Sequence, residues 1–170
     1  ETETSTLPEG GGGTMGPAAT GCTSLRFGEI HFAAQRGDVV RLWGLLVKGK
    51  VNVDSLTSNG FSALHFAAME GQAPTILTLG ALGVNPNLLT RSGYTAMHAA
   101  AGKNRVDAIK ALARIRAKVS LPDKALEATP LHWAAREGHL GALEALIELG
   151  SHPEFVDRAG NSALLYAARH

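Results

Sequence analysis

The sequence predicts an all-α fold, a solenoid of helix-turn-helix repeats with four full repeats, a truncated fifth and a flexible N-terminal tail. Three observations predict it. A similar sequence motif recurs every 33 or 34 residues, and each copy contains a turn and helical patterns. The first 25 residues contain neither the motif nor these patterns. The copies of the motif are EIHFAA (29–34), ALHFAA (63–68), AMHAAA (96–101), PLHWAA (130–135) and ALLYAA (163–168). A period of this size indicates stacked units, which bury their apolar faces against one another.

The N-terminal segment, residues 1–25, differs in composition from everything after it. It holds six glycines and three glutamates but no lysine or arginine. Such a segment buries too little apolar surface to offset the entropy that ordering costs. We therefore expect a flexible tail. The segment has no basic region followed by an apolar run, so it does not resemble an intact signal peptide.

The repeat domain is expected over residues 26–170. Its phase is set by four histidines at equivalent positions, His31, His65, His98 and His132. The next step of the period falls on Leu165. This alignment divides the domain into repeats 26–59, 60–92, 93–126, 127–159 and 160–170.

A first helix is expected at each copy of the motif. In the last four repeats a hydroxyl side chain stands just before it, where its oxygen can accept hydrogen bonds from the free N–H groups of the first turn. These residues are Ser62, Thr95, Thr129 and Ser162. Pro130 occupies the first helical position of the fourth repeat, where its missing N–H costs nothing. Each copy of the motif also ends in paired alanines, which let neighbouring first helices approach closely.

A second helix follows in each full repeat, because apolar residues recur three and four positions apart. In three repeats it is expected to end at a glycine, at Gly49, Gly83 and Gly150. The third repeat departs from this pattern. It has Arg116 at the glycine position, Glu127 at the turn-glycine position and one extra residue in 121–127. We expect its second helix to end less tightly and its turn to be the most irregular.

Together these features resemble the ankyrin repeat, a unit of about 33 residues with a turn, two helices and a Thr-Pro-Leu-His-x-Ala start. The fourth repeat matches as TPLHWA (129–134), and the second and third match as SALHFA (62–67) and TAMHAA (95–100). The first repeat is degenerate, with Gly28 and Glu29 where the motif has Thr-Pro. The resemblance implies an ankyrin-type solenoid that binds proteins and has no chemistry of its own.

The four histidines are the most obvious candidates for chemistry, because histidine is a common zinc ligand and general base. Neighbouring helices pack about 8–10 Å apart, whereas zinc requires nitrogens at about 2.1 Å. We therefore expect no two of these histidines to share a metal ion. Each is expected to hydrogen-bond to the backbone near its own turn and near the turn that follows.

No other motif indicates catalysis or a cofactor. The run GGGG (10–13) has neither a strand before it nor a helix or lysine after it, so we interpret it as a linker. The single cysteine, Cys22, excludes an intrachain disulfide, and its closest basic neighbour in sequence is Arg26. The 16 basic and 15 acidic residues argue against a nucleic-acid partner. We expect no enzyme activity, no cofactor, no metal and no transmembrane segment.

Ankyrin-type stacks present a concave surface made of the turn tips and the ends of the first helices. Carried over to this chain, the candidate partner-binding residues are Gln35, Arg36, Phe61, Met69, Glu70, Arg91, Tyr94, Lys103, Arg136, Glu137, Arg158 and Asn161. We expect them to face solvent together with Ala128, and Phe61, Met69 and Tyr94 to act as anchors. The aromatic residues one position after the histidine register are expected in the core rather than on a ligand-stacking face. They are Phe32, Phe66, Trp133 and Tyr166.

The sequence thus predicts a non-catalytic protein-protein interaction module that binds one or more partner proteins through its concave face. A slight excess of arginine and lysine on that face favours an acidic partner segment. The alternative is a structural or accessory subunit of a larger multiprotein assembly, with the N-terminal tail ordered against a partner.

Two further expectations concern the location and the C-terminal end of the chain. The lone cysteine favours an intracellular, cytoplasmic location; an organelle after removal of a targeting segment and the nucleus are the alternatives. The fifth repeat stops after its first helix, so Leu165 and Tyr166 are expected to be exposed. Either the native chain continues or a partner covers this end.

Overall fold

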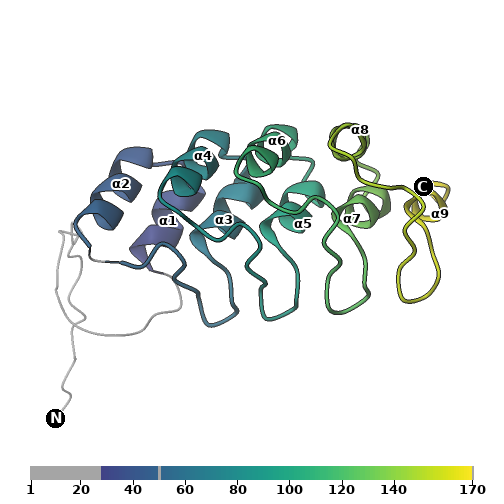
Figure 1. The fold of residues 1–170 in the computed structure, drawn as a ribbon, viewed down its shortest axis with the longest axis horizontal. Coiled ribbons are helices and arrows are strands. Elements are labelled where there is room, and N and C mark those ends of the chain that lie inside the picture. The colour runs from purple at the N-terminus through teal and green to yellow at the C-terminus, as the bar shows by residue number, and fades with distance from the viewer. Residues whose placement is uncertain (1–27, 50, 170) are drawn as a thin grey trace, which may run out of the picture.

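The computed structural model describes residues 28–49 and 51–169, and the expected tail over residues 1–25 lies outside them. As predicted, the described chain is an all-α stack of helix pairs (Figure 1). The helices are α1 (Glu29–Arg36), α2 (Val39–Val47), α3 (Ala63–Glu70), α4 (Ala73–Ala81), α5 (Ala96–Ala101), α6 (Val106–Arg114), α7 (Pro130–Arg136), α8 (Leu140–Glu148) and α9 (Ala163–Ala167).

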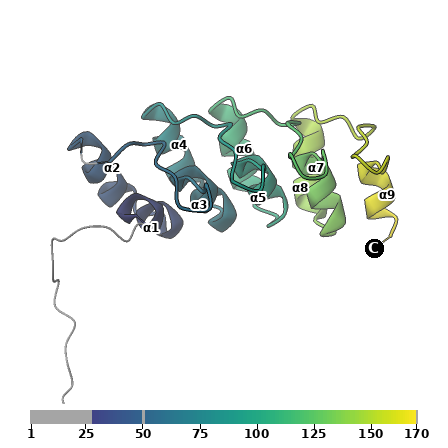
Figure 2. The same ribbon diagram turned by 90° about the horizontal axis from the view of Figure 1, so that it is seen from below.

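The helices form two layers. The odd-numbered helices pack on one another in order along an inner layer, and α2, α4, α6 and α8 do the same along an outer layer (Figures 1 and 2). Hairpin-like loops, here called fingers, project from the stack between successive repeats (Figure 1). In the described part of the chain, α9 is the one inner helix with no outer partner after it.

The histidines of the first four repeats hydrogen-bond to the residue that precedes each inner helix. The Nδ1 atom of His65 accepts hydrogen bonds from the backbone N–H of Ser62 at 3.2 Å and from its hydroxyl at 2.8 Å. Thr95 with His98 and Thr129 with His132 repeat this arrangement. The prediction that these hydroxyls cap the first turn is confirmed in the form of a capping box, in which the hydroxyl oxygen faces the backbone N–H of the histidine while the ring faces the N–H of the cap residue.

Ser162 shows what happens where the histidine is missing. Its hydroxyl oxygen accepts from the backbone N–H of Leu165 at 3.4 Å, which is the direct cap that the sequence predicts. Leu165 stands at the histidine position of the fifth repeat and offers no ring nitrogen. Where a histidine stands three positions along the chain, its ring adds a second, reciprocal bond to the N–H of the cap residue.

The other ring nitrogen of each histidine reaches the following finger, as predicted. His31 Nε2–H donates to the carbonyl of Ser55 at 3.0 Å, and His98 Nε2–H donates to the carbonyl of Ala128 at 3.0 Å. The corresponding bonds from His65 and His132 go to the carbonyls of Tyr94 and Asn161. Each ring therefore joins the start of its own inner helix to the finger that precedes the next one.

The fingers are also joined to one another through their backbones. Arg91 N–H donates to the carbonyl of Asn59 at 3.0 Å, and Lys124 N–H donates to that of Gly93 at 3.1 Å. Arg158 N–H donates to the carbonyl of Leu126 at 2.8 Å. These bonds continue from finger to finger and fix the spacing of the tips.

The finger at 123–128 is the irregular one, as predicted. Its closing hydrogen bond runs from Asp123 N–H to the carbonyl of Ala128, one residue farther along than in the other fingers. The corresponding bonds elsewhere join Thr57 with Phe61, Thr90 with Tyr94 and Asp157 with Asn161. Glu127 takes the left-handed conformation, with φ 55°, in place of the usual glycine.

Arg116 also adopts the left-handed conformation, with φ 64°, which costs a non-glycine residue about 1 kcal/mol. The expectation of a looser helix end was nevertheless wrong. The bonds from Arg116 N–H to Ala113 and from Ala117 N–H to Leu112 are both 3.0 Å, between the 3.1 Å of the matching bonds at Gly83 and Val84 and the 2.9 Å of those at Gly150 and Ser151. Burial of Ala117 and Leu112 holds the cap closed.

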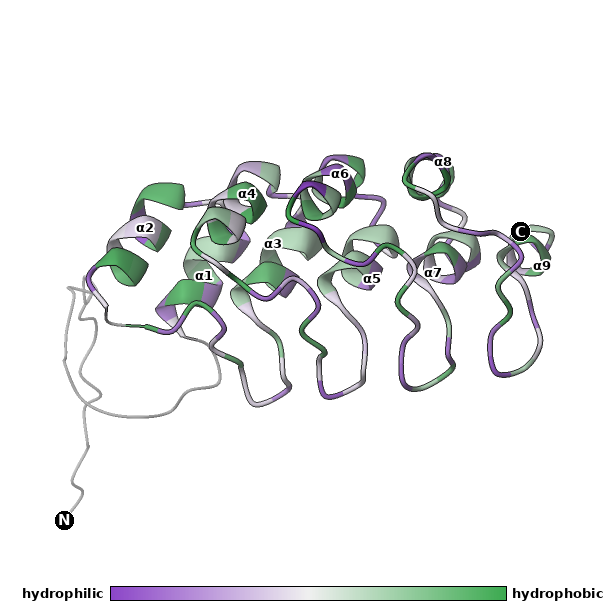
Figure 3. Ribbon diagram, viewed as in Figure 1, coloured by the Kyte–Doolittle hydropathy of each residue, from purple (hydrophilic) through white to green (hydrophobic). Residues whose placement is uncertain are grey.

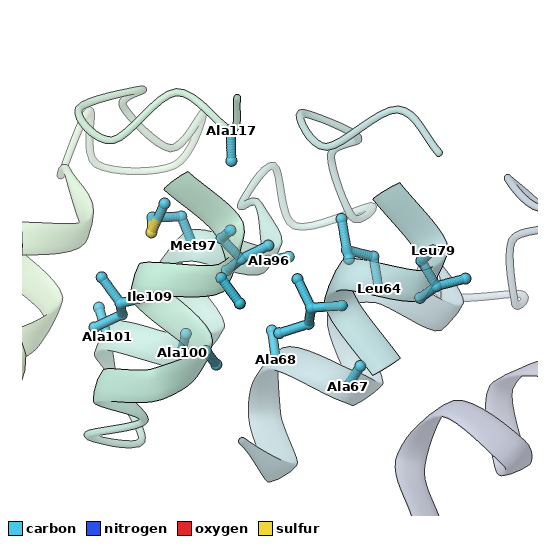
Figure 4. Close-up of a cluster of buried hydrophobic side chains, with 14 of the residues drawn as sticks. Leu64, Ala67, Ala68, Leu79, Ala96, Met97, Ala100, Ala101, Ile109 and Ala117 are labelled. Carbon is cyan, nitrogen blue, oxygen red and sulfur yellow. The ribbon is translucent and has the colours of Figure 1, made fainter. Parts of the chain in front are cut away.

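The paired alanines of the first four repeats form the centre of the stack, as predicted, whereas Ala167 and Ala168 of the fifth are exposed. Ala33, Ala34, Ala67, Ala68, Ala100, Ala101, Ala134 and Ala135 are completely buried. Figure 4 shows the alanines of α3 and α5 together with Leu64, Leu79 and Met97 in the space between the layers. The small side chains let the inner helices approach, and the larger aliphatic ones fill the volume between inner and outer helices.

The aromatic residues one position after the histidine register do not join this core, so that prediction was wrong. Phe32 is 44% exposed, and Phe66, Trp133 and Tyr166 are half-buried. The position is one step round the helix from the buried imidazole, which turns the ring towards the inner surface.

The last inner helix lacks the cover that its equivalents have. Leu164 is 74% exposed, whereas Leu131, which occupies the same position in the fourth repeat, is 1% exposed. Leu165 is exposed as predicted, but Tyr166 is half-buried, because its hydroxyl donates to Asp157 at 2.6 Å. Burial opposes ionisation of Asp157, but hydrogen bonds from Tyr166 and Asn161 outweigh it and hold its pKa at about 2.

Two glycines inside outer helices make a matched pair of stability tests. A Cβ on Gly44 would meet no other atom within 4 Å, whereas one on Gly80 would overlap Ile115 of the next repeat. We expect Gly44→Ala to stabilise the fold by about 0.5–1 kcal/mol and Gly80→Ala to destabilise it by about 1–2 kcal/mol. Urea unfolding of the two variants checks this; equal shifts would contradict the packing.

Burial of the two central histidines predicts loss of stability in mild acid. Desolvation lowers the pKa of His65 and of His98 from 6.5 to about 4. The unfolded chain therefore binds protons at a higher pH than the folded chain. Stability is complete above about pH 6.5 and falls by up to a few kcal/mol as the pH approaches 4. Urea unfolding at constant ionic strength measures this; an unfolding free energy equal at about pH 7 and about pH 5 would contradict it.

The exposed end of the stack predicts early opening of α9. Its five residues bury only Ala163 completely enough to count as core. We expect the amides of 163–168 to exchange with deuterium faster than those of α8, because fewer buried contacts hold them. Hydrogen exchange read by mass spectrometry compares the two segments. Equal protection would mean that the bond between Tyr166 and Asp157 secures this end.

Candidate protein-binding surface

The inner helices and the fingers together border one side of the stack. This concave surface comprises the fingers at 57–61, 90–94, 123–128 and 157–161 and the adjoining face of the inner helices. Figure 2 shows the repeats following one another along a gently curved line. The histidine hydrogen bonds fix the fingers relative to the inner helices, and the backbone bonds between fingers fix the fingers relative to one another.

The predicted partner-binding residues divide into two groups by exposure. Arg36, Glu70, Arg91, Lys103, Arg136, Glu137 and Arg158 are exposed. Gln35, Phe61, Met69, Tyr94 and Asn161 are half-buried. The expectation that Ala128 faces solvent was wrong, since it is 4% exposed beneath its finger. The proposed anchors are thus held in place from one side and accessible from the other.

Aromatic rings form a continuous row across the middle of the surface. The ring centroids of Phe66 and Phe61 are 5.5 Å apart, those of Phe61 and Tyr94 are 5.8 Å apart, and those of Tyr94 and Trp133 are 5.0 Å apart. Trp133 Nε1–H donates to the Asp123 carboxylate at 3.0 Å. These spacings are typical of favourable ring pairs, so the row is rigid before any partner arrives.

A shallow pocket lies at the end of this row. It measures about 210 Å³ and is lined by Met69, Tyr94, Ala99, Gly102, Lys103, Trp133, Arg136 and Glu137. Five of the twelve predicted residues meet here, although they come from three different repeats. The other seven lie outside the pocket lining. Sequence reasoning missed Trp133, because it assigned the aromatic residues at this repeat position to the core.

The size of the pocket decides what it can hold. Pockets for small molecules and cofactors usually measure about 300–1,000 Å³, so this one suits a single apolar side chain. The repeat histidines are not free to bind a metal, because both ring nitrogens of each are already engaged with backbone groups. Over the described residues, no group of three or more His, Cys, Asp or Glu side chains is placed to hold a metal ion.

Positive charge borders the pocket. The Arg136 guanidinium lies over the Trp133 ring at 5.3 Å and pairs with Glu137 at 3.2 Å. Lys103 and Arg91 make no ion pair with any residue that the structure describes. Arg36 and Glu70 make none either, so the predicted residues outside ion pairs are three cations and one anion, a net positive charge.

Other predicted residues already have partners. Gln35 donates to Glu70 at 3.3 Å, and Arg158 pairs with Glu127 at 3.1 Å. The side chain of Asn161 is hydrogen-bonded to Asp157 within its own finger. These residues extend the surface on both sides of the pocket.

Among the described residues, every helix is too short or too polar to span a lipid bilayer.

Several known proteins contain a segment similar to this chain. Palmitoyltransferase Hip14 of Drosophila melanogaster is 43% identical over 60 residues, which are 35% of this chain and 9% of that protein. Palmitoyltransferase AKR1 of Kluyveromyces lactis and human palmitoyltransferase ZDHHC17 are each 37% identical over 60 residues, or 8% and 10% of their lengths. The matching segment is thus about a tenth of each relative.

Family comparison covers more of the chain. The family described as ankyrin repeats (3 copies) matches residues 30–123, and that described as ankyrin repeats (many copies) matches residues 131–170. The matched ranges contain the outer helices and nearly all of each inner helix, whereas residues 124–130, with most of the irregular finger, lie between the two matches. The chain belongs to the ankyrin-repeat family.

Proposed function

We propose that this chain is a non-catalytic interaction module that binds a partner protein through its concave surface, centred on the pocket beside Trp133. The observation that carries this proposal is the convergence of Met69, Tyr94, Lys103, Arg136 and Glu137 on one pocket. Half-buried aromatic residues and methionine at the centre of a surface are typical of binding hot spots. Because the repeats fix these side chains in advance, association costs little ordering entropy.

The chemistry of the pocket indicates the kind of segment that would bind. An apolar side chain fits between Met69, Tyr94 and Trp133, which form the less polar wall. Lys103, which lines the pocket, and Arg91, on the finger at 90–94, make no ion pair with a described residue and are free to meet carboxylates of the bound segment. The partner segment that fits best is therefore extended and acidic, with one apolar anchor. Complementary charge would also speed its association.

A second role is favoured by the C-terminal face of the stack. Leu140 is 66% exposed, Ile147 is 51% exposed and Leu164 is 74% exposed, and all three line an apolar hollow of about 200 Å³ between α8 and α9. A chain built into a larger assembly as a structural subunit would bury such a face. The molar mass in solution separates the two roles, since a self-sufficient module stays monomeric.

The relatives are consistent with a binding role. Repeats like these occur in proteins named as palmitoyltransferases, of which the matching segment is about a tenth. We propose no transferase activity for the described repeats, because their polar side chains form capping and finger contacts. The single cysteine of the chain fits a reducing location such as the cytoplasm.

The proposal predicts the effect of two substitutions on partner binding. Lys103→Glu should repel an acidic segment, and Met69→Glu should place a charge in the apolar part of the pocket. We expect each to weaken binding tenfold or more, as for a hot spot worth about 1.4 kcal/mol or more. The partner is first captured from a lysate with the unaltered chain and is then titrated by calorimetry.

The matched control is Glu144→Lys, a charge reversal at an exposed site on outer helix α8. It should leave the affinity unchanged. If Lys103→Glu and Met69→Glu both bind as tightly as the unaltered chain while remaining folded, the pocket is not the binding centre.

A further inference from the structure

The outer helices carry a pattern that neither the core nor the concave surface explains. Their second, fifth and ninth residues face outward. At these positions α2 has Val40, Trp43 and Val47, α4 has Pro74, Leu77 and Ala81, α6 has Asp107, Lys110 and Arg114, and α8 has Gly141, Glu144 and Glu148. All are exposed except Gly141, which is half-buried. The outward side is therefore apolar on the first two outer helices and charged on the last two.

The six residues of α2 and α4 form what we call the apolar outer face. Val40 is 83% exposed, Trp43 is 51% exposed and Val47 is 59% exposed. The two helices pack side by side, and Figure 3 shows the strongly hydrophobic colouring of α2 in the outer layer. Because these side chains point away from the stack, the fold gains little from them. Exposed apolar side chains gathered on neighbouring helices often mark an interaction site.

Cations border the apolar outer face. Lys110 and Arg114 lie on α6, which packs against α4, and Arg116 and Lys118 follow directly in the chain. Lys48 ends α2. Within the described part of the chain, none of the five makes an ion pair.

Acidic groups lie on the far side of these cations. Asp107 shares α6 with them, and Glu148 of α8 lines a shallow hollow with Lys110 and Arg114. Glu144 stands on the same outward side of α8. At the outward positions, the charge therefore runs from none on α2 and α4, through two cations and one anion on α6, to two glutamates on α8.

We propose that the apolar outer face binds the surface of a lipid bilayer that contains anionic lipids. Trp43 and the two valines of α2 would enter the interface between headgroups and acyl chains, where tryptophan is favoured. Lys48, Lys110 and Arg114 would meet the negative headgroups at its border. Apolar residues beside unpaired cations are the combination that such binding requires. The acidic end at α8 would tilt away from the bilayer.

The composition of the face favours lipid over protein. A protein interface carries about one hydrogen bond per 100–200 Å², but these six side chains offer a single donor, the indole N–H of Trp43. A bilayer interior requires no hydrogen bonds from the side chains that enter it. The concave surface lies on the other side of the stack, so a partner protein and a membrane can bind at once.

Fluorescence of a single tryptophan tests the proposal directly. Trp133→Phe leaves Trp43 as the only tryptophan in the chain. Vesicles of phosphatidylcholine mixed with phosphatidylserine should shift its emission to shorter wavelength, and brominated acyl chains should quench it. Vesicles of phosphatidylcholine alone should bind much more weakly, because they do not attract the cations. No shift and no quenching with the mixed vesicles would overturn the proposal.

Variants of the otherwise unaltered chain separate the two contributions. The double variant Lys110→Ala, Arg114→Ala should weaken vesicle co-sedimentation about twenty-five-fold, at about fivefold for each cation near an anionic surface. Trp43→Ala should weaken it tenfold or more, since it removes the largest inserted side chain. Matched controls are Lys124→Ala on a finger and Leu140→Ala on α8, both exposed and outside the face. Equal losses with the controls would overturn the proposal.

The main competing occupant is a second copy of this chain. Sedimentation velocity on the unaltered chain and on Trp43→Ala distinguishes it from lipid. A monomer that binds mixed vesicles supports the proposal. A dimer that Trp43→Ala dissociates, with no binding to vesicles, would assign the face to self-association instead.

Discussion

The structure depends on one repeated interaction, the imidazole that spans from the start of an inner helix to the next finger. Its Nδ1 accepts from the residue before the helix, and its Nε2–H donates to a carbonyl about 29 residues later, as from His65 to Tyr94 at 3.3 Å. Both bonds require a neutral ring with the proton on Nε2. Burial enforces this state, because it lowers the pKa of His65 to about 4. A protonated ring would lose the first bond and carry a buried charge.

This bridge is what turns a series of local helices into a surface. A repeat contacts only its neighbours, so the position of each finger has to be fixed relative to the helix before it. The pocket shows the result. Met69, Tyr94 and Trp133 come from successive repeats, and none of the three contributes to the fully buried core. Their convergence follows from the regular spacing that the histidines and the finger bonds impose.

Local features were predictable from the sequence, whereas features decided between repeats were not. The irregular finger at 123–128 follows from one extra residue and needs no knowledge of neighbours. The cap at Ser62 follows from its hydroxyl side chain, and the structure shows it as one half of a capping box with His65. The loose end predicted at Arg116 was wrong, since buried Leu112 and Ala117 hold it closed. Whether an aromatic residue such as Trp133 is core or surface depends on the neighbouring repeat, which periodicity does not describe.

The two faces of the stack are free to differ because the core constrains neither. Buried positions of the outer helices are aliphatic or small in every full repeat, as at Leu42, Ile76, Ile109 and Leu146. Their outward positions change from valine and tryptophan on α2 to glutamate on α8. A sequence under pressure only to stay folded would have no reason to keep exposed apolar residues together on two adjacent helices and cations on the third. The order of those side chains along the outer layer is therefore best explained by something that the outer layer meets.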